Sequence, residues 1–461
     1  MACDLCFQSP TKGKQSSFVT VFSIWNTMVG STLLTLPWAV AQAGFVLAIV
    51  LLALMAALNL YTSYRIIKSA ESMKCPISGV TEFSDICKKY LGRCGEIITI
   101  FSSSILMVGI LLVYWVIMAN TLYSIVCFIY NTFEGTAHET GSSNSSYGDK
   151  YILCMMEDFS PEEESSELTV SRRVINSSNS TDDQLFHNYW DVNKTVPFFL
   201  LFLLVPIINF KSSSFFTKFT AFGNISAFYL LGFVTYKLSI WGLHMDFDEV
   251  PGHYFRWSFP VITGVGAMAL HIQVPILSIV RQQKNPQNNV RDLTIAYICV
   301  TLTYTYVGCA FYAGWPMISK DCIDQNFLNN FLPEDPLAFV ARVCIFAQMI
   351  TLYPLTMYIM RIQLLNTFFG SIWPSWKHVV ALNLIVIVVC LMFARFFAQI
   401  GTILRYTGSF CGQNYGFILP ALIYLLAEKK KDQLTIVKTS MHVLLVVLVL
   451  TNFIAQFFMP W

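Results

Sequence analysis

Charged residues are scarce in this sequence. Of its 461 residues only 12% are Asp, Glu, Lys or Arg, whereas 55% are hydrophobic, and the mean hydropathy is +0.57. A soluble domain carries about 25% charged residues, because it needs a hydrated surface. A charged fraction of about half that value excludes an ordinary soluble protein and indicates a surface that mostly faces lipid. The formal net charge of +2 also argues against a nucleic-acid partner.

Histidine is rare as well. The chain has 7 histidines, and we find no nucleophile–base spacing and no metal-ligand motif. We therefore expect neither an enzyme nor a bound cofactor. A cleavable signal peptide is not expected either, because residues 1–17 are polar and the first apolar run is too long and is followed by many others.

Long apolar runs are abundant. A helix needs about 20 apolar residues to cross roughly 30 Å of hydrocarbon. Eleven candidate runs lie near residues 18–40, 44–64, 97–130, 196–209, 215–241, 257–280, 293–316, 337–360, 378–395, 400–427 and 436–458. The sequence therefore predicts an all-α polytopic membrane protein with about eleven transmembrane helices.

The distribution of Lys and Arg predicts a cytosolic N-terminus. With that orientation the cytosolic loops hold 19 Lys and Arg residues and the opposite loops hold 6, as the positive-inside rule requires. The long polar segment 131–195 is then lumenal or extracellular. It contains four glycosylation sequons, at Asn144, Asn176, Asn179 and Asn193, which fit that placement.

Two cysteines lie in the predicted non-cytosolic loops. They are Cys154 and Cys322, out of 13 in the chain. In an oxidising compartment two such cysteines form a natural disulfide pair. The alternative is two free thiols.

The first apolar run is interrupted at its centre. Gly30 and Pro37 are poor helix residues, and several Asn, Thr and Ser residues lie between 26 and 35, at membrane depth. Irregular backbone is tolerated there only around a protected cavity. A broken helix offers free N–H groups on one half and free C=O groups on the other, which suit a carboxylate and a cation respectively.

The sixth run shows a second interruption, from Thr263 through Gly264, Gly266 and His271 to Pro275. Five helices separate the starts of the two broken runs, which predicts a 5+5 inverted repeat with one extra C-terminal helix, the arrangement of many transporters. The alternative is that the glycines merely allow close helix packing. The predicted units are a tail over 1–17, repeats over 18–241 and 242–427, and the last helix over 428–461.

Several stretches resemble a known family. Residues 26–39 read Asn-Thr-Met-Val-Gly-Ser-Thr-Leu-Leu-Thr-Leu-Pro-Trp-Ala and residues 42–45 read Gln-Ala-Gly-Phe, and both resemble the first-helix signature of the amino acid/auxin permease family. The stretches 209–212, 288–293, 319–327 and 405–408 are similar to the lysosomal sodium-coupled neutral amino acid transporters of solute carrier family 38.

The resemblance implies a function. It implies secondary active transport of arginine or of neutral amino acids such as leucine or glutamine, in the lysosomal or late endosomal membrane, with the plasma membrane as an alternative. The alternative function is an amino-acid sensor with little net flux. Such relatives dock on the Rag–Ragulator complex through a long N-terminal extension. Because about 17 residues precede the first helix here, we do not expect that contact.

The resemblance also implies site residues. The substrate backbone would lie along five residues of the first helix: Thr27, Met28, Gly30, Ser31 and Thr32. A Na⁺ site would lie between Asn26 and Thr351. Asn26 could instead make a structural interhelical hydrogen bond, and the Thr351 hydroxyl could bond back to its own helix.

Other residues have weaker claims. His271 is an ionisable group at membrane depth, so it is a candidate for pH sensitivity or for a structural hydrogen bond. Arg405 could serve transport, face water or pair with a lumenal acid. Two weak sterol patterns run from Arg342 to Leu352 and from Leu355 to Arg361, with interfacial anchoring as the alternative.

Overall fold

A computed structural model of the chain describes residues 15–71, 82–133, 151–154, 186, 189–192, 194–209, 222–245, 254–317, 319–371 and 373–459. The sequons at Asn144, Asn176, Asn179 and Asn193 lie outside these residues. The described part is helical and has no strand beyond two isolated bridges.

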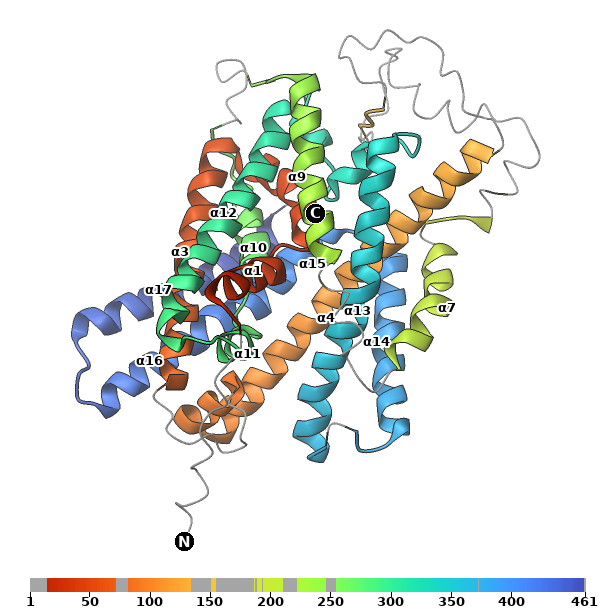
Figure 1. Ribbon diagram of the computed structural model, residues 1–461. Helices are drawn as coiled ribbons and strands as arrows, with labels where there is room; N and C mark the ends of the chain where they lie inside the picture. The colour runs from red at the N-terminus through yellow and green to blue at the C-terminus, as the bar shows by residue number, and fades with distance from the viewer. Residues whose placement is uncertain are drawn as a thin grey trace.

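Helix coincides with each of the eleven predicted runs (Figure 1). The helices of the first half are α1 (Ser17–Met28), η2 (Ser31–Leu34), α2 (Leu36–Ala43), α3 (Phe45–Glu71), α4 (Phe83–Phe133), α7 (Val196–Ile208) and α9 (Phe222–Trp241). Those of the second half are α10 (Pro260–Ala269), α11 (Ile276–Arg281), α12 (Asn289–Gly314), α13 (Pro336–Phe369), α14 (Trp376–Phe396), α15 (Ile400–Thr407), η7 (Gly408–Gly412), η8 (Asn414–Ile418), α16 (Leu419–Lys430) and α17 (Ile436–Ala455). The predicted all-α polytopic class is confirmed.

Not every run is one unbroken apolar helix. Among the described residues, seven helical segments are long and apolar enough to cross a membrane. The first and sixth runs are broken into shorter helices, and α7 has 13 residues. Helix α9 is 20 residues long, but Asn224 and Lys237 lower its hydropathy.

The long α4 explains where the third run begins. Gly92 has a φ of 72°, in the left-handed region, and bends the helix there. The apolar part of α4 therefore starts beyond this kink, near the predicted residue 97.

Helix packing separates a buried interior from a lipid-facing exterior. Helix α13 packs along α4, where the Trp115 and Tyr353 rings meet edge to face at 5.7 Å. Large apolar side chains are exposed on the outside, for example Phe101, Leu302 and Leu448. In water such exposure would be costly, whereas lipid solvates these side chains.

Candidate functional site

The first broken helix has the predicted interruption. Helix α1 ends at Met28, Val29 is extended, and Gly30 precedes the short 3-10 turn η2. Helix α2 then starts at Leu36 with Pro37 in its first turn, where a proline costs nothing because that N–H has no helical acceptor. The prediction of a broken first helix is confirmed.

The second interruption is shorter than predicted. Helix α10 continues to Ala269, so Gly264 and Gly266 lie inside it. The break covers residues 270–275, between α10 and α11. The expectation that the interruption starts at Thr263 is wrong. Gly264 has a packing role instead: a Cβ built there would lie 2.9 Å from the carbonyl oxygen of Arg405, closer than real Cβ contacts come.

Gly30 differs from Gly264 in what surrounds it. A Cβ built on Gly30 would meet nothing nearer than the Met28 carbonyl oxygen at 4.0 Å. The close-packing alternative therefore applies to Gly264 and does not apply to Gly30, which borders open space.

That space is a small cavity between the two breaks. It has a volume of about 80 Å³, which is room for about three water molecules at roughly 30 Å³ each. The lining residues come from both broken helices, from α4 and from α15: Thr27, Met28, Gly30, Ser31, Thr32, Ile110, Val113, Tyr114, Met268, Ala269, His271 and Leu404. All five residues predicted to contact substrate are therefore brought together at one cavity.

A tyrosine of α12 links the two breaks. The Tyr304 hydroxyl, fully buried, donates to the carbonyl oxygen of Met28 and lies 3.1 Å from that of Ala269. The Thr32 hydroxyl lies 3.1 Å from the same oxygen. A phenol has one proton, so it satisfies one carbonyl at a time while accepting from Thr32. Sequence reasoning missed Tyr304, which lies in an ordinary apolar run.

The unwound segment after α10 is held by polar residues of α3. The Gln273 side-chain amide donates to the Asn59 side chain at 2.9 Å and to the Thr62 hydroxyl at 3.3 Å. The Tyr297 hydroxyl donates to the Leu270 carbonyl at 3.2 Å. The Leu270 carbonyl, which the break frees, thus has a partner at membrane depth, as it must where water is scarce.

The family described as "Transmembrane amino acid transporter protein" matches residues 13–149 and 174–459. The chain belongs to this family. It is 41% identical to "Neutral amino acid transporter 9" of Rattus norvegicus, over 98% of this chain and 81% of that protein.

Two further comparisons agree. The chain is 39% identical to the "Sodium-coupled neutral amino acid transporter 9 homolog" of Caenorhabditis elegans, over 96% of this chain and 74% of the relative. The crystal structure of MhsT in complex with L-phenylalanine aligns with a TM-score of 0.52 at 9% identity, covering 96% of this chain and 99% of that one. The likeness to MhsT shows the fold alone. The family assignment rests on the family match and on the relatives in sequence.

In this family member, the residues proposed to hold Na⁺ are not joined by a hydrogen bond among the described residues. The Thr351 hydroxyl donates to the Gln348 carbonyl of its own helix at 2.8 Å, the harmless arrangement weighed above. Asn26 is partly buried at the end of α1, and neither residue lines the cavity. Their role as Na⁺ ligands stays a prediction.

His271 lines the cavity with two buried ring nitrogens. Neither nitrogen has a hydrogen-bond partner among the described residues. Its ring meets that of Tyr415 edge to face at 5.6 Å. A buried polar group of this kind calls for an explanation, and a ligand or water in the cavity would provide one.

The structure excludes one of the roles weighed for Arg405 and shows a structural role for Arg342. Arg405 is 0% exposed, so it does not face water. Arg342 donates to the carbonyls of Leu328, Phe331 and Leu332. Its guanidinium therefore braces a loop, which leaves the first sterol pattern without a free polar end.

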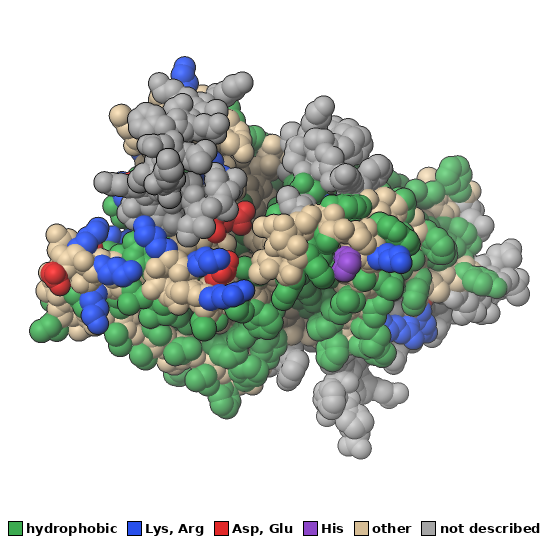
Figure 2. All heavy atoms as spheres, turned by 90° about the horizontal axis from the view of Figure 1, so that it is seen from below, with side chains coloured by type: hydrophobic (Ala, Val, Ile, Leu, Met, Phe, Trp, Pro, Cys, Tyr) green, Lys and Arg blue, Asp and Glu red, His purple; other side chains and the backbone are tan. Residues whose placement is uncertain are grey.

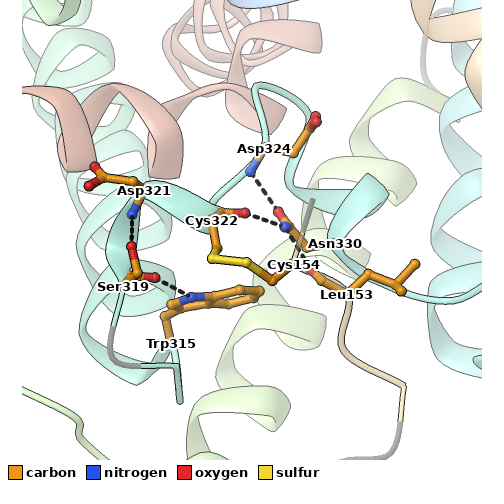
Figure 3. The surroundings of a disulfide bond; sticks show 8 residues. All are labelled: Leu153, Cys154, Trp315, Ser319, Asp321, Cys322, Asp324 and Asn330. Carbon is orange, nitrogen blue, oxygen red and sulfur yellow. Dashed lines mark hydrogen bonds between the residues drawn. A yellow bond between two sulfur atoms is a disulfide. The ribbon is translucent and has the colours of Figure 1, made fainter. Parts of the chain in front are cut away.

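A disulfide joins Cys154 and Cys322, with Cα atoms 5.0 Å apart (Figure 3). The Asn330 side-chain amide donates to the Cys322 carbonyl at 2.7 Å and to the Leu153 carbonyl at 3.2 Å. Another loop residue, Gln325, accepts from the Gly401 N–H at 2.8 Å, at the start of α15. The disulfide thus fastens residues 151–154 to the loop between α12 and α13.

Replacing both Cys154 and Cys322 by Ala should destabilise the protein by about 2–5 kcal/mol, because the bond closes a long loop in the unfolded chain. Thermal unfolding of the purified variant measures this. Cys94→Ala, which removes an exposed free thiol, is the control. A double variant as stable as the control would contradict the expectation.

Proposed function

We propose that the chain is a secondary active amino acid transporter of the lysosomal membrane, coupled to Na⁺ and selective for neutral amino acids such as leucine or glutamine over arginine. The observation that carries the proposal is the cavity at which the ends of two broken helices meet. Such sites bind zwitterions, because free carbonyls and free N–H groups converge there.

The two ends suit the two charges of an amino acid. Helices α1 and α10 end at Met28 and Ala269, which both line the cavity and whose carbonyls both lie within hydrogen-bond distance of the Tyr304 hydroxyl. These carbonyls would accept from the substrate ammonium. The opposite charge, the carboxylate, would lie at the N–H groups of Gly30 to Thr32, which precede or open the next helical turn and so have few helical acceptors.

The remaining wall favours a neutral side chain. Ile110, Val113, Met268 and Leu404 are apolar, and no charged side chain is among the residues that line the cavity. An arginine guanidinium would be desolvated there without a carboxylate, at a substantial cost. A neutral side chain avoids that cost, and His271 would offer it a hydrogen bond.

Alternating access follows from the same parts. The broken helices α1–α2 and α10–α11 would move together against a scaffold that includes α4, α7, α13 and α14. The named Na⁺ ligands, Asn26 and Thr351, lie on opposite sides of this division. A Na⁺ ion between them would therefore favour one arrangement of the two parts, which is how an ion gradient would drive the substrate. The relative from Caenorhabditis elegans is described as sodium-coupled, which supports this coupling.

Orientation and location rest on the sequence. Figure 2 views the molecule of Figure 1 from below, and this face shows several Lys and Arg side chains and few Asp and Glu. A basic face of this kind favours the cytosolic side. The four sequons and the disulfide lie on segments that this orientation places in the lumen.

Counterflow in proteoliposomes tests the proposal. Vesicles loaded with unlabelled leucine should accumulate labelled leucine, arginine should compete poorly, and replacing Na⁺ by choline should abolish accumulation. Exchange without Na⁺ would refute the coupling alone. Binding of leucine without any exchange would refute transport and indicate a sensor.

A further inference from the structure

Helices α7 and α14 meet at one end and leave a groove at the other. Beyond the end of α7, the Asn383 side chain of α14 donates to the Asn209 side chain at 3.0 Å. Figure 1 shows the two helices side by side. Toward the side of the molecule that carries the disulfide, they enclose an open cavity of about 470 Å³.

The groove has an apolar floor and a cationic mouth. Its lining residues are Lys194, Phe198, Val388, Leu391, Met392, Arg395 and Phe396. Those from α14 follow the i, i+3, i+4, i+7, i+8 spacing of one helix face. Lys194 precedes the first turn of α7, and Arg395 is in the last turn of α14. The topology therefore places two cations from distant segments at the same membrane interface.

The depth of the groove matches one leaflet. Asn383 and Arg395 are twelve residues apart on α14, which corresponds to about 18 Å along a helix. Half of the hydrocarbon core is about 15 Å thick. An acyl chain that enters beside Arg395 would therefore reach the point where the helices close, with its headgroup at the two cations.

Charge selects the headgroup. Lys194 pairs with Asp191 at 3.3 Å, and its side chain is 65% exposed, so it retains donors for a ligand. Among the described charged residues at the mouth, two are cations, Lys194 and Arg395, and one is an anion, Asp191. A phosphodiester with no compensating ammonium carries one negative charge, whereas a zwitterionic headgroup gains nothing from a net field.

We propose that this groove binds an anionic glycerophospholipid of the leaflet on the disulfide side, with its phosphate between Lys194 and Arg395. The acyl chain lies against Phe198, Leu391 and Met392. The lipid fills the gap that α7 leaves beside α14 and so braces part of the proposed scaffold. This site does not depend on which amino acid is carried, or on transport itself.

Native mass spectrometry of the purified full chain tests the site, by titration with palmitoyl-oleoyl-phosphatidylglycerol and, separately, with the phosphatidylcholine of the same chains. We expect tighter binding of the first phosphatidylglycerol than of phosphatidylcholine. Lys194→Gln combined with Arg395→Gln should weaken that first binding about twenty-five-fold, because each basic residue near an anionic headgroup contributes a factor of about five.

The control is Lys377→Gln combined with Lys429→Gln, which removes two exposed cations elsewhere and should leave the preference intact. Leu391→Trp, which blocks the groove without changing charge, should also abolish it. In the parent protein, a photoactivatable phosphatidylglycerol should label the 388–396 segment. Equal binding of the two lipids, an unchanged preference in the Lys194/Arg395 variant, or labelling elsewhere only would overturn the proposal.

Discussion

Tyr304→Phe is expected to reduce amino acid uptake by about ten- to hundredfold while leaving the protein folded, since a lost buried hydrogen bond costs about 1–3 kcal/mol. The substitution removes one oxygen and keeps the ring. It leaves the carbonyls of Met28 and Ala269, which end the two broken helices, without their shared donor. The relative placement of the two half-helices should then relax, and the cavity should lose its shape.

The control is Tyr306→Phe on the same helix. The Tyr306 hydroxyl pairs with that of Thr235 at 2.7 Å, on an exposed face away from the cavity. Labelled leucine uptake into proteoliposomes, normalised to reconstituted protein, compares the two variants. If Tyr304→Phe and Tyr306→Phe transport equally well, the hydroxyl between the breaks has no role in transport.

Gly30→Val should abolish amino acid binding without loss of folding. A Cβ at Gly30 meets only the Met28 carbonyl oxygen, at 4.0 Å, and Gly30 lines the cavity, so the added side chain would occupy cavity space. The branched side chain is also stiff at χ1 and cannot swing aside. An amino acid at 100 times its dissociation constant stabilises a protein by about 2.7 kcal/mol, and this thermal stabilisation should vanish in the variant.

Gly264→Val should have the opposite effect and should impair folding. At that position the new atoms would meet the Arg405 backbone and side chain at about 3 Å, and overpacking of this kind costs about 1–3 kcal/mol or more. Its yield and melting temperature should fall.

A well-folded Gly30→Val protein that keeps parental leucine binding and uptake would place the substrate elsewhere.

The sequence predicted the first break better than the second. Residues 26–37 combine glycine, proline and several polar side chains, and lipid tolerates these only around a protected cavity. In the second break, the glycines drew attention to Thr263 through Gly266, which is helical. Glycine signals both unwinding and close contact, and only the position of the Arg405 backbone distinguishes the two at Gly264.

The predicted Na⁺ ligands show a second kind of feature that the sequence does not specify. Asn26 and Thr351 were named from a resemblance, and the structure joins them by no hydrogen bond among the residues it describes. An ion site needs several oxygens at fixed distances. Such a set comes from segments far apart in the chain, and no spacing in one sequence specifies it.

The sequence by itself determined the eleven apolar runs, the two breaks five helices apart and the cysteines available for pairing. Lipid imposes length and hydropathy on each helix separately, so these features are local. Tertiary structure alone decided which side chains meet at the site. Tyr304 and Tyr306 are two positions apart in the same apolar run, yet one joins the broken helices and the other bonds to Thr235. Two residues are about 200° apart around a helix, and only the packing of α12 against its neighbours fixes which of them lies between the two breaks.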